Sequence, residues 1–214
     1  MCGRFVRASG IAEISKWFGI PSERIAGLPR PSFNIAPGNP VAAVLGGEAP
    51  SVATLHWGFK LPGAGSRLII NARSEGLMQK PAFRKHLAGG RCLIVADGFY
   101  EWRQRPGQPE PFYFSLGPGK MMAMAGLCQP GWPEGNRGVI ITVPANSLVG
   151  EVHGRMPAIM APQKYRDWLD PDLRDPELLL PMLEPWSLEG LFSCRVGTTV
   201  NSPGNDTPEC IRPV

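Results

Sequence analysis

The second residue of the chain, Cys2, combines two groups that could do covalent chemistry. An initiator methionine is usually removed when a small side chain follows it, and Cys2 would then carry a free α-amine beside its thiol. Reference pKa values are roughly 8 for the amine and about 8.5 for the thiol, so we expect both to be nucleophilic near neutral pH without much tuning. Such a 1,2-aminothiol can attack an acyl carbon through sulfur. It can also condense with an aldehyde to an imine, which the sulfur closes into a thiazolidine.

Three further polar residues have side chains suited to catalysis. Glu101 stands in an aromatic run, Asn71 ends an apolar strand and His153 lies on a loop. A carboxylate among aromatic side chains is partly desolvated, which raises its pKa and suits it to proton transfer. Imidazole titrates near neutral pH, and an amide orients a substrate without titrating. Alternatively, Glu101 faces solvent and the loop histidine is an ordinary surface residue, as we expect for His56 and His86. Spacing alone does not join these residues to the N-terminus.

The elements that must position these residues are mostly strands. The 214 residues are 43% hydrophobic and include 26 glycines and 24 prolines, which indicates a soluble globular chain with many turns. We expect strands at residues 41–45, 52–57, 68–70, 91–96, 98–102, 111–116, 121–127, 139–143 and 192–196. Because strands outnumber helices without alternating with them, we predict one α+β domain over residues 1–214. Its architecture would be a curved, mainly antiparallel sheet or a partly closed β-barrel with flanking helices.

Helical signals occur in four segments. The expected helices are residues 9–18, capped by Ser9 and ended by Gly19; residues 74–87, interrupted or kinked at Pro81 and ended by Gly89-Gly90; residues 162–169; and residues 176–183. We expect these helices to pack on the sheet, with the apolar face of the first one in the core.

Charge and cysteine usage limit the classes of function. The net charge of +4 is uneven, because residues 1–107 carry 14 basic and 6 acidic residues while residues 108–214 carry 8 and 12. A basic half is expected for a protein that approaches phosphates. The five widely spaced cysteines indicate reduced thiols, with no disulfide framework and no metal site. No apolar run is long enough for a membrane span and no signal peptide is evident, so we expect an intracellular, cytoplasmic protein.

Seven short motifs together resemble one known family. They are Met1-Cys2-Gly3-Arg4-Phe5, FNIAPG at residues 33–38, Trp57-Gly58, NARSE at residues 71–75, Pro81-Ala82-Phe83-Arg84, RCLIVADGFYEW at residues 91–102 and HGRMP at residues 153–157. They occur in the order seen in the SRAP family of SOS response-associated peptidases, or abasic-site processing proteins. The resemblance runs from residue 2 to the segment 196–202, which is nearly the whole chain.

The resemblance implies a function in DNA damage and repair. Members of the family sense abasic sites in single-stranded DNA and link to them covalently through the N-terminal cysteine. By that similarity Cys2 would form a thiazolidine with the ring-opened sugar aldehyde, Asn71 would position the amine and sugar, Glu101 would shuttle protons, and His153 would assist ring opening and reversal. The similarity also implies autocatalytic removal of Met1, hence the hydrolase or protease label, and a further lyase activity.

The resemblance extends to DNA contacts and partners. The positions that match family residues near DNA are Gly3, Arg4, Pro37, Arg73, Arg84 and Thr142. Phosphate contacts are blind to sequence, so we expect little base preference and strong salt dependence. The protein would be a DNA-associated monomer that needs no cofactor, has no membrane partner and meets other proteins at replication forks.

One departure from the family pattern and two other functions remain to be weighed. Family members often carry a tryptophan between the WG and NAR motifs, but residues 59–70 contain none, which leaves base stacking beside the lesion in question.

Cys2 would serve equally well in an N-terminal-nucleophile amidohydrolase or peptidase that acts on substrates other than DNA. A third alternative is a non-catalytic module that binds single-stranded DNA.

Overall fold

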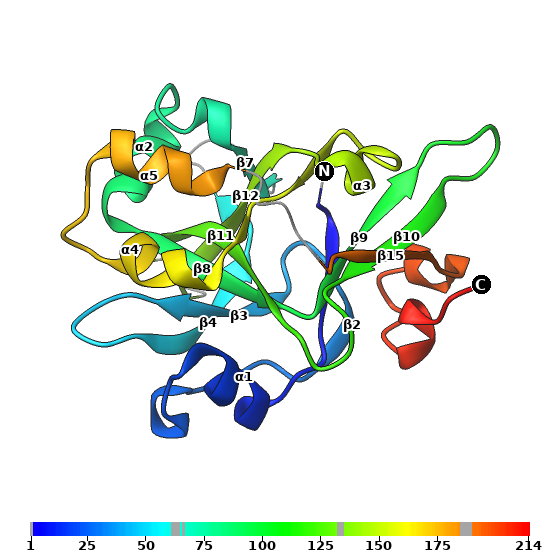
Figure 1. The fold of residues 1–214 in the computed structure, drawn as a ribbon, viewed down its shortest axis with the longest axis horizontal. Helices are drawn as coiled ribbons and strands as arrows, with labels where there is room; N and C mark the ends of the chain where they lie inside the picture. The colour runs from blue at the N-terminus through cyan, green and yellow to red at the C-terminus, as the bar shows by residue number, and fades with distance from the viewer. Residues whose placement is uncertain (1, 61–64, 66, 132–134, 185–189) are drawn as a thin grey trace.

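The computed structural model describes residues 2–60, 65, 67–131, 135–184 and 190–214. Its strands form two main sheets that lie next to each other (Figure 1), and the short helix α3 (Ser147–Gly150) precedes the turn that carries His153. Helices cover the outer side of the larger sheet. The expected α+β class is confirmed.

The larger sheet contains a closed ring of strands. Its five ring members are β3 (Pro40–Leu45), β4 (Ser51–Trp57), β8 (Arg91–Ala96), β11 (Met122–Gln129) and β12 (Arg137–Pro144). Starting at β12, the pairing runs through β4, β3, β8 and β11 and returns to β12. Only the pairings of β12 with β4 and with β7 (Asn71–Arg73) are parallel in this sheet's described ladders. The prediction of a curved, mainly antiparallel sheet is therefore confirmed.

Two short strands extend the ring on the side of the N-terminus. These are β13 (Arg155–Pro157), which pairs with the second half of β12, and β14 (Ile159–Met160), which pairs with β11. Separately, β5 (Phe59–Lys60) and β6 (Leu68–Ile69) form a small two-stranded ladder. β12 thus has β7 and β13 as its partners at the end nearest the N-terminus.

The smaller sheet holds the N-terminal strand between two neighbours. Its strands, in spatial order, are β15 (Phe192–Arg195), β10 (Glu110–Ser115), β9 (Gly98–Arg103), β1 (Arg4–Arg7) and β2 (Ser32–Ile35). β8 of the ring continues into β9 through Asp97 alone, so the two sheets are joined directly. The Asp97 carboxylate accepts hydrogen bonds from the backbone of Ala8 and Ser9 and from the Ser9 hydroxyl, which fixes the end of β1 at this junction.

The other α-helices are α1 (Ile11–Phe18), α2 (Pro81–Gly89), α4 (Tyr165–Leu169) and α5 (Pro176–Leu179). The short 3₁₀ turns are η1 (Ser22–Arg24), η2 (Ser74–Gly76), η3 (Pro162–Lys164), η4 (Leu180–Leu183), η5 (Thr198–Asn201) and η6 (Pro208–Ile211). Among the described residues, no helix is long and apolar enough to cross a membrane.

One expectation about helix ends is wrong. The first helix is capped by Gly10 and not by Ser9, whose hydroxyl is bound to Asp97 instead; Gly19 ends the helix in the left-handed conformation as expected. The helix expected over residues 74–87, interrupted or kinked at Pro81, is interrupted before that proline. Residues 74–76 form only η2, and Pro81 starts α2 because proline has no N–H to donate and its fixed φ suits the first helical position.

The main core lies inside the ring and between it and the smaller sheet. All six residues of β8 are buried, as expected for a strand covered on both faces. Phe5 of β1 packs edge-on against Trp57 of β4, with ring centroids 5.1 Å apart, and joins the two sheets. On the other face of the smaller sheet, a second cluster forms around Tyr100, Val196 and Cys210.

Gly98, the first residue of β9, has no side chain and so allows β10 to pack closely against it. A Cβ atom at this position would lie 2.4 Å from the Phe114 carbonyl oxygen and 2.5 Å from the Tyr113 ring. We predict that Gly98→Ala lowers the free energy of unfolding by about 1–3 kcal/mol, as overpacking does in other cores. Urea denaturation should show this loss, and Gly150→Ala, which meets no atom within 4 Å, is the control. Equal stability of the two variants would contradict the prediction.

Candidate active site

Cys2 lies at the entrance to β1 and is completely buried. Its carbonyl oxygen accepts a hydrogen bond of 2.8 Å from the side-chain Nδ2 of Asn71. β1 is held on both sides, by β9 through the pairs Arg4 with Tyr100 and Phe5 with Phe99 and by β2. The sheet therefore fixes the position of Cys2 relative to β9.

Asn71 is placed by the parallel pairing of β7 with β12, in which it lies opposite Ile140. The carbonyl just before it, of Ile70, accepts a hydrogen bond of 2.9 Å from the indole of Trp57. With Nδ2 bound to Cys2, the buried Oδ1 atom has no hydrogen-bond partner among the described residues. Because a buried polar atom without a partner is costly, this oxygen is available to accept a hydrogen bond from a substrate.

Glu101 points into the molecule and is 2% exposed. Side chains alternate along β9, so Tyr100 and Trp102 face the second cluster while Glu101 shares the face of Phe99, toward Cys2. Burial raises the pKa of the Glu101 carboxyl, and the nearby His153 opposes this effect. The alternative in which Glu101 faces solvent is wrong, since the strand's hydrophobic alternation turns the carboxylate inward.

His153 completes the group from a third direction. Asn146 caps α3 through its Oδ1 atom, and the backbone N–H of His153 binds the carbonyl of Val149 at 2.9 Å. The imidazole Nδ1 lies 3.9 Å from Glu101 Oε2. Its side chain is 30% exposed, so the group opens to solvent on this side.

The structure thus gathers the four residues that the sequence suggested for catalysis. Asn71 binds the Cys2 backbone, Glu101 lies close enough to raise the pKa of the Cys2 thiol, and His153 faces Glu101. These residues come from the N-terminus, β7, β9 and the turn after α3. We refer to Cys2, Asn71, Glu101 and His153 below as the cysteine cluster.

Burial and a neighbouring charge both act on the thiol of Cys2. Burial is the largest cause that raises the pKa of its thiol far above the ordinary value, and the charge of Glu101 raises it further. In this environment the neutral thiol is favoured, because a thiolate loses its hydration, and attack through sulfur requires a base that takes its proton. The expectation that Cys2 needs little tuning concerns the chain without Met1 and stays a prediction.

The residues expected near DNA are in different environments. Pro37, Arg73 and Arg84 are exposed, and Gly3 is half-buried. The guanidinium of Arg4 binds Asn34 Oδ1 and the carbonyl oxygen of Val200, each at 2.9 Å, and so ties β1 to the C-terminal segment. A phosphate contact by Arg4 remains a prediction and would have to replace or share these bonds.

Thr142, which the resemblance places near DNA, is completely buried. Its carbonyl and hydroxyl oxygens accept hydrogen bonds from Arg155, and its contact with DNA stays a prediction. His86 is also buried, with its ring 5.2 Å from that of Phe59, so the expectation of a surface histidine is wrong there. His56 is half-buried.

Two residues beside the cluster were missed by sequence reasoning. The guanidinium of Arg155 binds the carboxylate of Glu75 through both terminal nitrogens, Nη1 to Oε1 at 2.5 Å and Nη2 to Oε2 at 3.0 Å. The same Nη2 binds the carbonyl of Thr142 at 2.6 Å. The two residues stand in the NARSE and HGRMP runs, and that was the available signal, but a pairing between residues 80 positions apart has no local signature.

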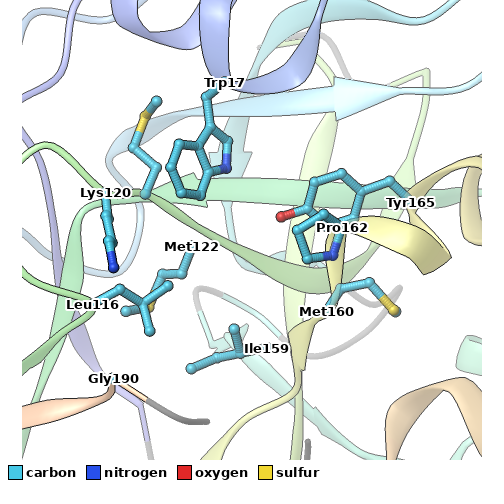
Figure 2. A pocket seen from close by; sticks show the side chains of 10 residues that line it. Trp17, Leu116, Lys120, Met122, Ile159, Met160, Pro162, Tyr165 and Gly190 are labelled. Carbon is cyan, nitrogen blue, oxygen red and sulfur yellow. The ribbon is translucent and has the colours of Figure 1, made fainter.

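A separate pocket lies beside α1 and α4 (Figure 2). Trp17, Lys120, Met122 and Tyr165 are among its lining side chains. All four members of the cysteine cluster are described by the structure, and none of them lines this pocket. Within the described part of the chain, no group of His, Cys, Asp and Glu side chains is arranged to hold a metal ion.

Comparison with known proteins decides the family. A family model described as SOS response associated peptidase (SRAP) matches residues 1–203. The chain belongs to the SRAP family. Abasic site processing protein YoqW of Bacillus subtilis is 37% identical over 99% of each chain. Abasic site processing protein HMCES of Gallus gallus is 32% identical over 67% of this chain and 50% of its own.

Solved structures agree with this SRAP fold. A Bacteroides thetaiotaomicron protein of 20% identity has a TM-score of 0.81 over 100% of both chains. A phage-related protein of Bordetella bronchiseptica, 26% identical, has a TM-score of 0.73 over 91% of this chain and 94% of its own. The first of these likenesses concerns the fold alone.

The proximity of Glu101 to Cys2 in this SRAP chain can be measured by titration. We predict that Glu101→Gln lowers the pKa of the Cys2 thiol, because it removes a negative charge beside the thiolate. The pKa should stay above the ordinary value, since burial is the larger cause. NMR titration of ¹³Cβ-labelled cysteine would follow the change, with Glu110→Gln on β10 as the control. An unchanged or raised pKa would contradict the placement.

The Glu75–Arg155 pair predicts a pH dependence of stability. Its hydrogen bonds lower the pKa of Glu75 from 4.5 to about 2. A carboxyl with a lowered pKa stabilises the fold above its unfolded pKa, and this contribution is lost as the pH falls from about 4.5 to about 2. Because the Glu75 side chain is 55% exposed, solvent screening keeps the gain at neutral pH to about 1 kcal/mol or less.

The measurement compares urea midpoints of the wild type and Glu75→Gln from pH 7 to pH 2. The wild type should be more stable at pH 7, and the two curves should converge between pH 4.5 and 2. A difference that persists unchanged at pH 2 would show that the carboxylate charge is not its cause.

Proposed function

We propose that this SRAP protein processes abasic sites by trapping the sugar aldehyde of single-stranded DNA on Cys2. The observation that carries the proposal is the cysteine cluster, in which a buried N-terminal cysteine lies beside a buried carboxyl group and an imidazole. Relatives named abasic site processing proteins, such as YoqW at 37% identity, support the choice of substrate. A 1,2-aminothiol and an aldehyde are well matched reactants.

The reaction requires the α-amine of Cys2 and so follows removal of Met1. The amine nitrogen adds to C1′ of the ring-opened deoxyribose, and loss of one water gives an iminium ion. The Cys2 sulfur then adds to the same carbon, and the thiol proton leaves to a base. The product is a thiazolidine, with one water released overall.

Glu101 is the base best placed for the sulfur step. It lies close to the thiol, and burial raises its pKa toward neutral pH, so that it accepts a proton more readily than an exposed carboxylate. The same carboxyl group, once protonated, can return its proton to sulfur and reverse the adduct. Proton return through Glu101 would account for reversal without a second base.

Asn71 and His153 have positioning and proton-transfer roles in this proposal. Asn71 holds the Cys2 carbonyl through Nδ2 and offers Oδ1 to a sugar hydroxyl. His153 lies at the solvent-facing side of Glu101, where an imidazole can pass a proton to the ring oxygen as the sugar opens. The cluster would therefore act on a sugar delivered from the side of His153.

The proposal also includes removal of Met1 by the protein itself. Attack of the Cys2 sulfur on the Met1 carbonyl would give a thioester and free the α-amine, and one water would release methionine. The buried carboxyl of Glu101 supplies the base. The family description as a peptidase supports this step.

DNA would reach the cluster along exposed basic residues. Arg73 follows Asn71 on β7, and Arg84 is exposed on α2. Arginine binds phosphate with two parallel hydrogen bonds, so these positions fit a DNA backbone. We expect a monomeric, DNA-associated protein that meets other proteins at replication forks.

The test uses protein without Met1 and a single-stranded oligonucleotide that holds one abasic site. We expect a band that survives denaturing electrophoresis, with the mass of protein plus DNA less one water. Cys2→Ala should abolish it, and Cys2→Ser, which keeps the amine, should form only a hydrolysable imine. Absence of the wild-type band, despite a confirmed N-terminal Cys2, would refute the proposal.

A second candidate is an N-terminal-nucleophile hydrolase of small amides or peptides, which the peptidase description of the family favours. Turnover of amide substrates without DNA, lost in Cys2→Ala, would support it. A non-catalytic DNA-binding module would instead retain DNA natively but leave no denaturation-resistant band in either protein.

A further inference from the structure

The ion pair of Glu75 and Arg155 connects two segments that carry members of the cysteine cluster. Glu75 lies in η2, which follows β7 and hence Asn71 directly. Arg155 begins β13, two residues after His153. The guanidinium binds both carboxylate oxygens of Glu75, so the two segments are joined by a bidentate contact.

This contact crosses β12. In the sheet, Thr142 of β12 lies opposite Arg73 of β7 and opposite Pro157 of β13. Arg155 reaches over this strand and binds the Thr142 carbonyl at 2.6 Å and its hydroxyl at 3.3 Å on the way to Glu75. Its side chain is 16% exposed, so the guanidinium is held in one place by packing and by these bonds.

The backbone of Arg155 determines the surroundings of the His153 ring. Its N–H lies 3.0 Å from His153 Nδ1 and donates to it, while its carbonyl oxygen lies 3.1 Å from the same atom. Acceptance of the amide hydrogen requires Nδ1 to be unprotonated, and the proton of a neutral ring is then on Nε2. If Nδ1 carried a proton, it would lose the hydrogen bond from the Arg155 amide. It would instead face two acceptors, the Arg155 carbonyl oxygen and Glu101 Oε2, which lies 3.9 Å away.

We propose that Glu75 and Arg155 are positioning residues, which hold the turn after α3 so that Nδ1 of His153 faces the Arg155 amide and Glu101. The inference rests on the proposed function, because it concerns the residue that would move protons there. Neither residue touches the reacting atoms. Their effect is to fix which ring nitrogen carries the proton and the distance between the His153 and Asn71 segments.

Matched variants separate this role from general stability. Glu75→Gln keeps the size of the side chain but removes its charge, and Arg155→Lys keeps a positive charge but loses the bidentate geometry. Glu110→Gln is the control, because Glu110 forms ion pairs with Arg105 and Arg195 away from the cluster.

The first readout is the tautomer of His153 in protein without DNA. The chain has three histidines, so ¹⁵N NMR of the imidazoles at pH 8 is readily assigned with a His153→Asn sample. Wild type and Glu110→Gln should show the Nε2–H form. Glu75→Gln and Arg155→Lys should show a mixture of both tautomers. Unchanged wild-type shifts in both variants would overturn the inference.

The second readout is the rate of denaturation-resistant crosslinking to the abasic oligonucleotide. We expect Glu75→Gln to be about tenfold to a hundredfold slower than the wild type, as misplacement of a catalytic group produces. A rate equal to or above that of Glu110→Gln would overturn the inference. If the wild type itself forms no crosslink, the proposed function fails, and the tautomer measurement still tests the positioning role.

Discussion

Burial of Glu101 beside Cys2 is the constraint on which the rest of the site depends. Burial favours the neutral form of both the carboxyl and the thiol, and the charge of Glu101 raises the pKa of the Cys2 thiol further. Both groups therefore hold their protons more tightly than they would in water. Burying ionisable groups costs stability, and the packing of the surrounding fold must offset that cost.

The fold holds this pair through β12 and β9. β9 turns Glu101 inward by strand alternation, and its pairing with β1 fixes the N-terminus opposite. β12 pairs with β7 on one side and β13 on the other, so a single strand sets the positions of Asn71 and the turn that carries His153. Four segments that are far apart in the sequence thus meet at the cysteine cluster, because the strand pairings bring them together.

Much of this architecture could be predicted from the sequence. Continuous apolar runs such as Arg91–Ala96 identified the buried strands, because a strand covered on both faces needs no polar alternation. The errors came where local signals competed. Pro81 was taken as an interruption or a kink within one helix and is a helix start, and Ser9 was taken as a cap and binds Asp97. Both outcomes depend on partners that the local sequence does not show.

The site itself was predicted unevenly for the same reason. The residue types of the cysteine cluster were recognisable, and the family resemblance joined them. The raised pKa of Cys2 and the pairing of Glu75 with Arg155 could not be predicted, because both arise from contacts between segments that meet only in the folded chain. Hydrophobic periodicity can be seen in the sequence, but the burial of a side chain and the charges around it depend on the folded structure.

The central claim is that both the amine and the thiol of Cys2 bond to one sugar carbon, and peptide mass spectrometry tests it most directly. Trypsin cleaves after Arg4, so a crosslinked sample digested with nuclease and trypsin releases Cys2-Gly3-Arg4 with its adduct. The account predicts a sugar remnant on this tripeptide that resists both borohydride reduction and thiol alkylation. A remnant on a lysine, or a tripeptide whose thiol still alkylates, would contradict the account.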